Sequence, residues 1–308
     1  MLCSFDIDTY ISRLEAYGDG GIKYERGCPL SSLTTFKIGG ECTVAVFPCD
    51  KDQLLHAVLS TKETGARVKV IGRGSNLLCS DAGYDGIVIV SEGAKAISLD
   101  GDCLECESGA SLTATAQAAA EASLESAEFM YGIPGTVGGG VFMNAGAYGG
   151  QMSDVVESVC YVDINTLECF TVSGEALDFS YRHSLFSAHP EYAVLSVRIK
   201  LKAGSKDEIQ SKMRDFITRR REKQPLEYPS AGSTFKRCEG HYTSQLIDEA
   251  GLKGLRVGGA EVSEKHAGFV INRGGATARD VLALIEKVKA KIKEKYNLDI
   301  ECEVEYLE

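Results

Sequence analysis

Apolar residues follow two periods along the chain, and the two periods alternate. A period of two is typical of a strand with one buried face, and spacings of three and four are typical of an amphipathic helix. The pattern predicts a strand–helix–strand block within residues 1–95 and a second mixed block that starts again at Leu104. Strands are expected at 42–47, 68–71, 86–90, 155–163, 168–172 and 194–201, and helices at 6–17, 51–64 and 111–123.

The last third of the chain is mainly helical in its pattern. A helix over 206–224 is expected to stop before Pro225, because the residue that precedes a proline is disfavoured in the helical conformation. Thr277 and Asp280 have the spacing of a capping box and predict the start of a long amphipathic helix. A short helix is expected at 244–250.

The final segment, residues 298–306, alternates apolar and acidic residues and predicts a strand. Glu301, Glu303 and Glu305 fall on one face of that strand. Such a face either is exposed to solvent or places one carboxylate in a cleft as an acid or electrostatic group. The alternation alone leaves both interpretations open.

Residues 131–150 break both periods, because eight of these twenty residues are glycine. In a regular element each glycine costs about 0.5–1 kcal/mol relative to alanine, so neither a packed helix nor a central strand is expected here. Apolar side chains such as Phe142 and Tyr148 favour an ordered, half-buried loop over a flexible linker. Backbone amides without side chains in the way can bind phosphate oxygens, and we expect those of residues 135–140 to be available to a phosphate group.

A second glycine-rich turn, GRGSN at 72–76, follows the predicted strand 68–71. Its glycines leave the backbone bare, and Ser75 and Asn76 add short hydrogen-bonding side chains. The turn is not a Rossmann fingerprint, because Leu77 stands where the third glycine would be needed. A dinucleotide bound here is therefore expected in a different fold.

Composition narrows the class of protein. A net charge of −11 argues against non-specific binding of nucleic acid, and no apolar stretch approaches 18 residues, so we expect no membrane segment. The first residues lack the features of a signal peptide. Eleven scattered cysteines are typical of reduced thiols, which predicts a cytoplasmic protein. Cys103 and Cys106 lack a second pair of ligands, and we expect no metal site.

Two further segments carry candidate chemistry. Ser233 lies in a turn rich in hydroxyl groups, with Lys236 nearby, but no nucleophile elbow surrounds it. This turn is either catalytic or simply capped by its own hydroxyls. Arg182 lies between Tyr181 and His183, and its guanidinium suits a carboxylate or phosphate. A surface salt bridge is the alternative interpretation of Arg182.

Taken in order, these motifs resemble those of the UDP-N-acetylmuramate dehydrogenases, also called UDP-N-acetylenolpyruvoylglucosamine reductases. Any one of the motifs is weak evidence, but together they are specific, and the resemblance extends over residues 34–306. The motifs are TTFKIGG at 34–40, GRGSN at 72–76, GIPGTVGG at 132–139, NAGAYG at 144–149, YRHS at 181–184, AGSTFK at 231–236 and Glu303 with Val304.

The resemblance implies an α+β fold. A two-lobed FAD-binding domain of the vanillyl-alcohol-oxidase type would comprise residues 1–95 and 96–203, and a C-terminal substrate domain residues 204–308. It implies non-covalent FAD, NADPH as co-substrate, and reduction of the enolpyruvyl ether of UDP-N-acetylglucosamine to UDP-N-acetylmuramate. This reaction belongs to peptidoglycan synthesis and so to cell-wall biogenesis, cell shape and division. We expect a small-molecule UDP-sugar partner, no nucleic-acid or membrane partner, and a monomer or weak homodimer.

The resemblance also assigns residues. Ser233 resembles the proton donor, Arg182 the activating guanidinium and Glu303 the acidic partner, although Glu301 remains an alternative on the same predicted face. Residues expected to bind substrate are Tyr181, Lys223 and Lys236. Residues expected to bind the cofactor are Gly72, Arg73, Gly74, Ser75, Asn76, Leu77, Ile133, Pro134, Gly135, Thr136, Gly138, Gly139, Asn144, Ala145 and Gly146.

One subtype of the family inserts a loop with a substrate-covering tyrosine before the last domain. Residues 201–209 are too few for that loop, so the chain resembles the shorter subtype. Another FAD-dependent oxidoreductase of the same fold and a non-catalytic nucleotide-binding module remain alternatives. No histidine lies between His56 and His183, so the glycine-rich segments cannot tether a flavin through histidine. A preference for NADPH over NADH stays open.

Overall fold

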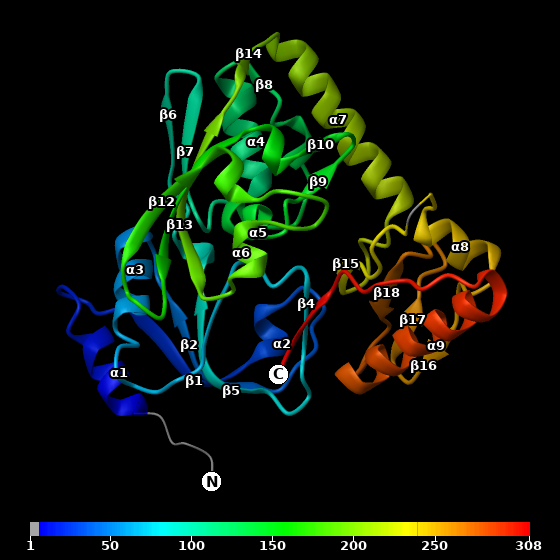
Figure 1. The fold of residues 1–308 in the computed structure, drawn as a ribbon, viewed down its shortest axis with the longest axis horizontal. Coiled ribbons are helices and arrows are strands. Elements are labelled where there is room, and N and C mark those ends of the chain that lie inside the picture. Colours follow the sequence, from blue (N-terminus) through cyan, green and yellow to red (C-terminus); the bar gives the residue numbers. More distant parts are fainter. Residues whose placement is uncertain (1–5, 239) are drawn as a thin grey trace. The chain divides into compact units, whose positions relative to one another are not determined.

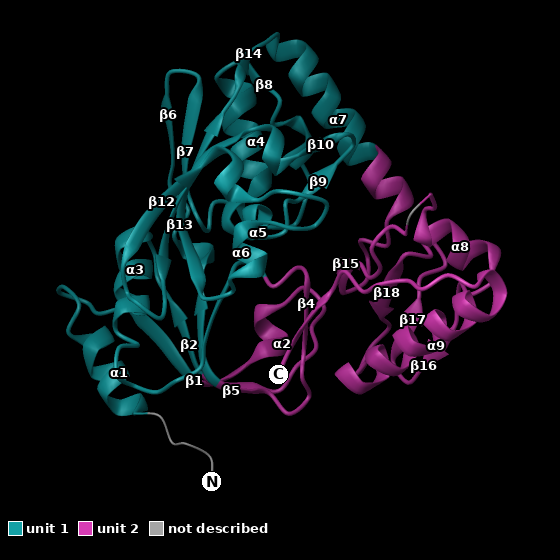
Figure 2. Ribbon diagram, in the orientation of Figure 1, with its two compact units in different colours: residues 1–26, 44–73, 86–218 teal, residues 27–43, 74–85, 219–308 magenta. Residues whose placement is uncertain are grey.

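The computed structural model describes residues 6–238 and 240–308, and it contains both helices and strands throughout (Figure 1). The chain forms two compact units (Figure 2). The first unit contains the residues up to Arg26 together with 44–73 and 86–218, and the second contains 27–43, 74–85 and 219–308. Each unit is therefore built from segments that are far apart in the sequence.

The first unit begins with a sheet that is built around the predicted strand–helix–strand block. Its strand order is β1-β2-β5-β3, and β3 runs parallel to β5 with Val68 opposite Ile87. The strands are β1 (Lys23–Pro29), β2 (Glu41–Phe47), β3 (Val68–Ile71) and β5 (Tyr84–Val90), and the helices beside them are α1 (Ile7–Glu15) and α3 (Lys51–Leu59). Helix α3 ends at Leu59, five residues before the predicted end, because the chain turns at Ser60.

A second sheet of the first unit has the antiparallel order β12-β11-β13-β7-β6. Helix α4 (Leu112–Glu121) contributes buried alanines, including Ala116 and Ala119, to the same core as Leu104 of β7. Small side chains let the helix pack closely against this core. The other elements here are β6 (Ile97–Asp100), β7 (Cys103–Glu107), β8 (Leu124–Glu125), β11 (Val156–Asp163), β12 (Cys169–Ser173), α6 (Leu185–Ala188), β13 (Tyr192–Lys200) and β14 (Lys202–Ala203).

The glycine-rich residues 131–150 contain a helix, so the prediction of a loop without one was wrong. Helix α5 (Val137–Phe142) starts after Thr136, whose Oγ1 accepts a hydrogen bond from the Gly139 amide at 3.3 Å. A Cβ at Gly138 would collide with Ser108, so glycine here allows close packing. Tertiary contact thus outweighs the low helix propensity of glycine. The segment ends in the hairpin of β9 (Gly146–Ala147) and β10 (Gly150–Gln151).

The second unit is centred on a four-stranded sheet with the order β15-β18-β17-β16. Helix α9 (Ala278–Tyr296) begins with the predicted capping box, in which Thr277 Oγ1 accepts from the Asp280 amide at 3.1 Å. Its apolar stripe packs into the core of this unit. The other elements are α2 (Leu30–Leu33), β15 (Ser230–Ser233), α8 (Thr243–Glu249), β16 (Arg256–Val257), β17 (Ala260–Val262) and β18 (Phe269–Asn272). Helix α7 (Lys206–Lys223) begins in the first unit and ends before Pro225, as predicted.

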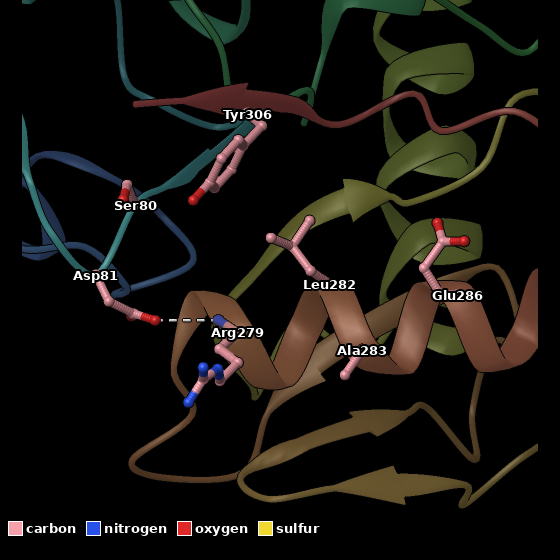
Figure 3. Close-up of a pocket in the computed structure, with 7 residues that line it drawn as sticks. All are labelled: Ser80, Asp81, Arg279, Leu282, Ala283, Glu286 and Tyr306. Carbon is pink, nitrogen blue, oxygen red and sulfur yellow. Dashed lines mark hydrogen bonds between the residues drawn. The ribbon is translucent and has the colours of Figure 1, made fainter.

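A short parallel ladder ties residues 74–85 to the end of the chain. Strand β4 (Leu77–Cys79), which the sequence did not predict, pairs with β19 (Glu305–Leu307) so that Leu77 lies opposite Glu305. Just beyond β4, the Asp81 carboxylate accepts hydrogen bonds from the amides of Ala278 and Arg279 at 2.7 and 3.0 Å. Figure 3 shows the bond to Arg279. The side chain of Asp81 therefore caps α9 and fixes the end of β4 against it.

The predicted strand over 298–306 was wrong in its length, because only Glu305–Leu307 is a strand. The preceding residues form only an isolated antiparallel bridge, between Cys302 and Phe235, before the chain changes partner to Asn76. The Lys236 amide donates to Glu301 O at 2.9 Å, the Glu303 amide donates to Thr234 O at 2.8 Å, and the Glu305 amide donates to Asn76 O at 2.9 Å. Side chains alternate between two faces in any extended chain, whether or not that chain pairs with one neighbouring strand. The alternation in the sequence therefore predicted the extended backbone but not its hydrogen-bond partners.

Candidate active site

Ser233 is the last residue of β15, and an irregularity in the β15–β18 pairing precedes it. Gly232 has φ of +74°, a backbone conformation that glycine adopts without strain. Thr234 follows and is almost fully buried. Its amide donates to Gly268 O at 2.8 Å, and its Oγ1 accepts from the Val270 amide at 3.0 Å. These bonds fix the backbone on which Ser233 stands.

The same threonine brings Glu303 beside the serine turn. Thr234 O accepts a hydrogen bond from the Glu303 amide at 2.8 Å, so Glu303 is bonded directly to the residue that follows Ser233. Both Ser233 and Glu303 are half-buried. The structure therefore brings together two of the three predicted catalytic residues, which lie on separate segments of the second unit.

Glu301 has a different environment from Glu303. Its carboxylate is 76% exposed and pairs with Lys236, with 3.1 Å between Oε2 and Nζ. An exposed pair of this kind contributes little to stability, so Lys236 can exchange this partner for a ligand at low cost. The solvated position of Glu301 favours Glu303 as the carboxylate near the serine turn.

His266 is linked to this turn through hydrogen bonds of Gly268. Its Nδ1 accepts a hydrogen bond from the Gly268 amide at 3.2 Å, and Gly268 O in turn binds the Thr234 amide. Burial lowers the pKa of His266, so the imidazole is neutral at pH 7. The sequence did not predict this supporting role of His266.

Arg182 lies in the first unit, in a turn between strands β12 and β13 of the second sheet. Its φ is +55°, and its Nη1 donates to Asn144 O at 3.5 Å. The guanidinium also lies 5.4 Å from the centre of the Tyr181 ring. A non-glycine residue with positive φ is strained and often marks a functional position. The predicted pair of Tyr181 and Arg182 is therefore held in one place.

Asn144 was predicted to bind the cofactor, but its side chain is used within the protein. Its Nδ2 donates to Ser180 O at 2.9 Å and its Oδ1 accepts from the Ser153 amide at 3.0 Å. Asn144 is almost fully buried and connects the end of α5 to the turn that carries Arg182. Its side chain orders the Arg182 turn, which the sequence did not indicate.

The two glycine-rich segments meet within the first unit. A Cβ at Gly72 would collide with the Thr136 side chain, so the end of β3 and the start of α5 are in close contact. Only a residue without a side chain permits this approach. That both segments serve one cofactor stays a prediction.

The amides of residues 135–140 are not bare, contrary to the expectation from composition. The Val137 amide donates to Ala110 O, the Gly138 amide to Ser108 O and the Gly140 amide to Thr136 O, each at 2.8 Å. These donors build the segment itself and are not available to a diphosphate. That residues within 133–146 bind the cofactor stays a prediction, and it now concerns their side chains and exposed backbone atoms.

The amides of Arg73, Gly74 and Ser75 behave differently. None of the three donates a hydrogen bond to another residue in the part of the chain that the structure describes. Gly74 has φ of +58°, and successive amides around such a residue form a concave nest for an anion. This turn therefore fits the diphosphate of a dinucleotide.

The end of the glycine-rich segment is fastened to α7. The ring of Tyr148 stacks on that of Phe216, with 4.4 Å between centroids and 9° between planes, and the Tyr148 hydroxyl donates to Phe216 O at 3.1 Å.

Lys223, predicted to bind substrate, is exposed at the end of α7 in the second unit. The connection at residues 201–209 holds only β14 and the start of α7, so it has no inserted loop.

A hollow of about 430 Å³ lies between the β4–β19 ladder and α9 (Figure 3). It contains none of the predicted site residues, so it is separate from the candidate site. Its lining residues are Ser80, Asp81, Arg279, Leu282, Ala283, Glu286 and Tyr306.

The cysteines of the described residues are free thiols, and several are buried. Burial raises the pKa of Cys79 and of Cys106 to about 12, because a thiolate is poorly solvated in an apolar interior. These two thiols are therefore unreactive core residues. None of the described helices is long and apolar enough to cross a membrane.

Comparison with known proteins places this arrangement in context. Residues 224–307 match the family model for the C-terminal domain of UDP-N-acetylenolpyruvoylglucosamine reductase, and residues 42–172 match that for an FAD binding domain. The UDP-N-acetylenolpyruvoylglucosamine reductase of Lactobacillus acidophilus is 45% identical over 92% of this chain and 95% of its own length. That of Clostridium botulinum is 45% identical over 90% of each chain.

The solved structure of the Thermus caldophilus enzyme of the same name has a TM-score of 0.78 and 35% sequence identity. The match covers 93% of this chain and 99% of that one. The predicted α+β fold, with an FAD-binding part followed by a C-terminal domain, is thereby confirmed.

Proposed function

The chain belongs to the UDP-N-acetylenolpyruvoylglucosamine reductase family, and on this premise we propose that it reduces the enolpyruvyl ether of UDP-N-acetylglucosamine to UDP-N-acetylmuramate, with NADPH as reductant. The observation that carries this proposal is identity of 45% over nine-tenths of the chain. The product is a precursor of peptidoglycan. The free thiols and the nucleotide-sugar substrate support a place in the cytoplasm.

The reaction consumes one hydride and one proton. FAD, when bound, supplies a carrier that takes two electrons as hydride from NADPH and passes hydride to the terminal carbon of the substrate alkene. The proton then goes to the neighbouring carbon, so NADPH is oxidised and the alkene is reduced. The residues of the chain must stabilise the negative charge that develops toward the substrate carboxylate, and must deliver the proton.

We assign these tasks to the three predicted catalytic residues. Arg182 is a permanent cation with a planar fork of donors, which suits the developing enolate. Ser233 is a neutral donor on a backbone fixed through Thr234, and Glu303 is joined to the same threonine at 2.8 Å. A serine hydroxyl is a weak acid, so it needs assistance from neighbouring groups such as Lys236 or from water.

The cofactor is assigned to the two glycine-rich segments. The amides of Arg73, Gly74 and Ser75, which donate to no other residue that the structure describes, fit a diphosphate, and residues 133–146 are assigned to the same cofactor. The first unit has two hydrophobic cores, one that includes Val46 and Ile89 and one that includes Leu104 and Val137. We infer from these cores two lobes at 1–95 and 96–203, although the first core also includes Val162, Ala193 and Leu195. The substrate domain is assigned to 204–308, and the second unit adds residues 27–43 and 74–85 to most of that range.

Replacement of Gly72 by alanine is expected to weaken FAD binding at least tenfold. The new Cβ would collide with Thr136 and force apart the two segments that form the site, and overpacking of this kind typically costs about 1–3 kcal/mol. Flavin absorbance per protein, measured during titration of the apoprotein with FAD, gives the affinity.

Two further variants make the test of Gly72 specific. Gly20→Ala adds a Cβ with no neighbour within 4 Å and should leave FAD affinity unchanged. Adding Thr136→Ala to Gly72→Ala removes the colliding Oγ1 and should restore part of the affinity. Full FAD affinity in Gly72→Ala alone would exclude this site for the cofactor.

The proposed function is tested on the purified protein without oxygen. Addition of NADPH should bleach the bound flavin, and the enolpyruvyl substrate should then restore its colour with formation of UDP-N-acetylmuramate. A non-catalytic nucleotide-binding protein would show no bleaching. A different oxidoreductase of this fold would be bleached by another donor, or would regain its colour only with another acceptor.

A further inference from the structure

The acidic residue of the proposed site lies on a segment that has little structure of its own. Residues 298–304 belong to no strand, so individual hydrogen bonds determine where Glu303 stands. One of these bonds runs from the Glu303 amide to Thr234 O at 2.8 Å. The other side of the residue is held by a segment more than two hundred residues earlier in the chain.

That second support is Asn76, the last residue of the GRGSN turn. Its side-chain Nδ2 donates to Glu303 O at 3.0 Å, and its backbone oxygen accepts from the Glu305 amide at 2.9 Å. Asn76 thus forms two hydrogen bonds to the C-terminal segment, one on each side of Val304. The side-chain bond to Glu303 O thus extends the contact between the two segments beyond the β4–β19 pairing, which begins with Leu77 opposite Glu305.

The support is itself firmly held. Strand β4 follows Asn76 directly and pairs with β19, and Asp81 beyond it caps α9 through hydrogen bonds of 2.7 and 3.0 Å. Asn76 is therefore a side-chain donor on a fixed backbone. Its amide can hold a carbonyl because it is a neutral donor of the right length, whereas aspartate has no donor and alanine has no polar group.

We propose that Asn76 is a positioning residue for the Glu303 carboxylate, and that it supports the half-reaction in which the enolpyruvyl substrate is reduced. The inference rests on the proposed role of Glu303 in that step. From the sequence, Asn76 was expected to bind cofactor, and in the structure its side-chain amide binds the backbone carbonyl of Glu303. The turn that offers free amides to the diphosphate thereby also fixes the carboxylate of the second unit.

The test compares the two half-reactions in Asn76→Ala, in buffer that contains excess FAD. Reoxidation of the reduced flavin by the enolpyruvyl substrate should slow about tenfold, the rate equivalent of one lost hydrogen bond. Bleaching by NADPH should change less than about twofold, because that step needs no acid. Asn76→Ser, which keeps a polar turn residue but is too short to reach Glu303, should show the same split if the alanine variant fails to hold FAD.

A control distinguishes positioning from general loosening of the unit. Asn272 also donates its side-chain amide to a distant backbone carbonyl, Phe36 O, at 3.2 Å within the same unit. Asn272→Ala should lower the thermal midpoint without changing the ratio of the two half-reaction rates. A similar change of that ratio in Asn272→Ala and Asn76→Ala would overturn the inference.

A double-mutant cycle with Glu303→Gln completes the test. If Asn76 acts through Glu303, then Asn76→Ala should slow reoxidation little further once Glu303 is glutamine. Independent, multiplying losses would overturn the role of Asn76 while leaving that of Glu303 intact. If Glu303→Gln alone leaves reoxidation unchanged, the proposed role of Glu303 fails, and the positioning role fails with it.

Discussion

Ser233→Ala is expected to slow reduction of the enolpyruvyl substrate by about 10²–10⁴-fold, the usual effect of losing a positioned general acid. Bleaching of the flavin by NADPH should stay nearly unchanged, because that half-reaction moves a hydride and requires no proton at the substrate carbon. FAD content should also stay the same. Stopped-flow traces of the two half-reactions, recorded separately, provide the measurement.

The structure gives this expectation its physical basis. Ser233 ends β15, and the buried Thr234 behind it is held at its amide, its hydroxyl and its carbonyl. The serine hydroxyl thus stands on a backbone that is already ordered before substrate binds, which is the condition for efficient proton delivery. Loss of the hydroxyl removes one oxygen and leaves that backbone intact.

Ser230→Ala is the matched control for Ser233→Ala. Ser230 lies in the same strand, and its backbone oxygen, which the substitution keeps, accepts a hydrogen bond from Thr35 at 2.7 Å. Both half-reactions should proceed normally in this control. Equal slowing of both half-reactions in Ser233→Ala would show that Ser233 has only a structural role in the turn. If neither slows, another group delivers the proton, and Glu303 is the next candidate.

Arg182→Lys is expected to retain FAD and its colour but to lower turnover by about 10²–10³-fold, the range seen when one donor to a developing oxyanion is removed. Lysine keeps the positive charge and loses the planar fork that binds a carboxylate with two parallel hydrogen bonds. The loss should appear in reoxidation by substrate and not in bleaching by NADPH. Steady-state turnover and the same half-reaction measurements check it.

The environment of Arg182 supports a large effect. The residue has φ of +55°, its guanidinium donates to Asn144 O at 3.5 Å, and it lies 5.4 Å from the Tyr181 ring centre. Lysine would neither reproduce the fork nor lie flat near the ring. Arg26→Lys, at a surface ion pair with Asp8, is the control and should turn over normally. Normal turnover in Arg182→Lys would leave Arg182 as a surface ion-pairing residue.

Local pattern was a good guide wherever one period extended over a whole element. Strand β3 has the predicted bounds, Thr277 and Asp280 form the predicted capping box, and α7 stops before Pro225. Each of these depends on neighbours in sequence, so the chain specifies them without knowledge of the fold. The order of short motifs likewise indicated the family, which the comparisons confirm.

The pattern misled where distant partners decided the outcome. Helix α5 forms from a glycine-rich sequence because Gly138 must lie against Ser108, and the extended chain before β19 bonds to Lys236, Thr234 and Asn76 in turn. Neither result is visible in the spacing of apolar residues. The burial of side chains along one element repeats with a fixed period, so it can be read from the sequence. Which distant segment supplies a hydrogen-bond partner follows no such period.

The sequence by itself therefore determined the residue types of the candidate site: a hydroxyl-rich turn, a guanidinium, a terminal carboxylate and two glycine-rich segments. Only the tertiary structure decided how these are used. It used amides of α5 within the protein and joined Glu303 to both Thr234 and Asn76. It left the amides of Arg73, Gly74 and Ser75 without an acceptor among the described residues. The physical reason is that these choices depend on which backbone groups remain unsatisfied after the chain has packed, and that quantity exists only in the folded molecule.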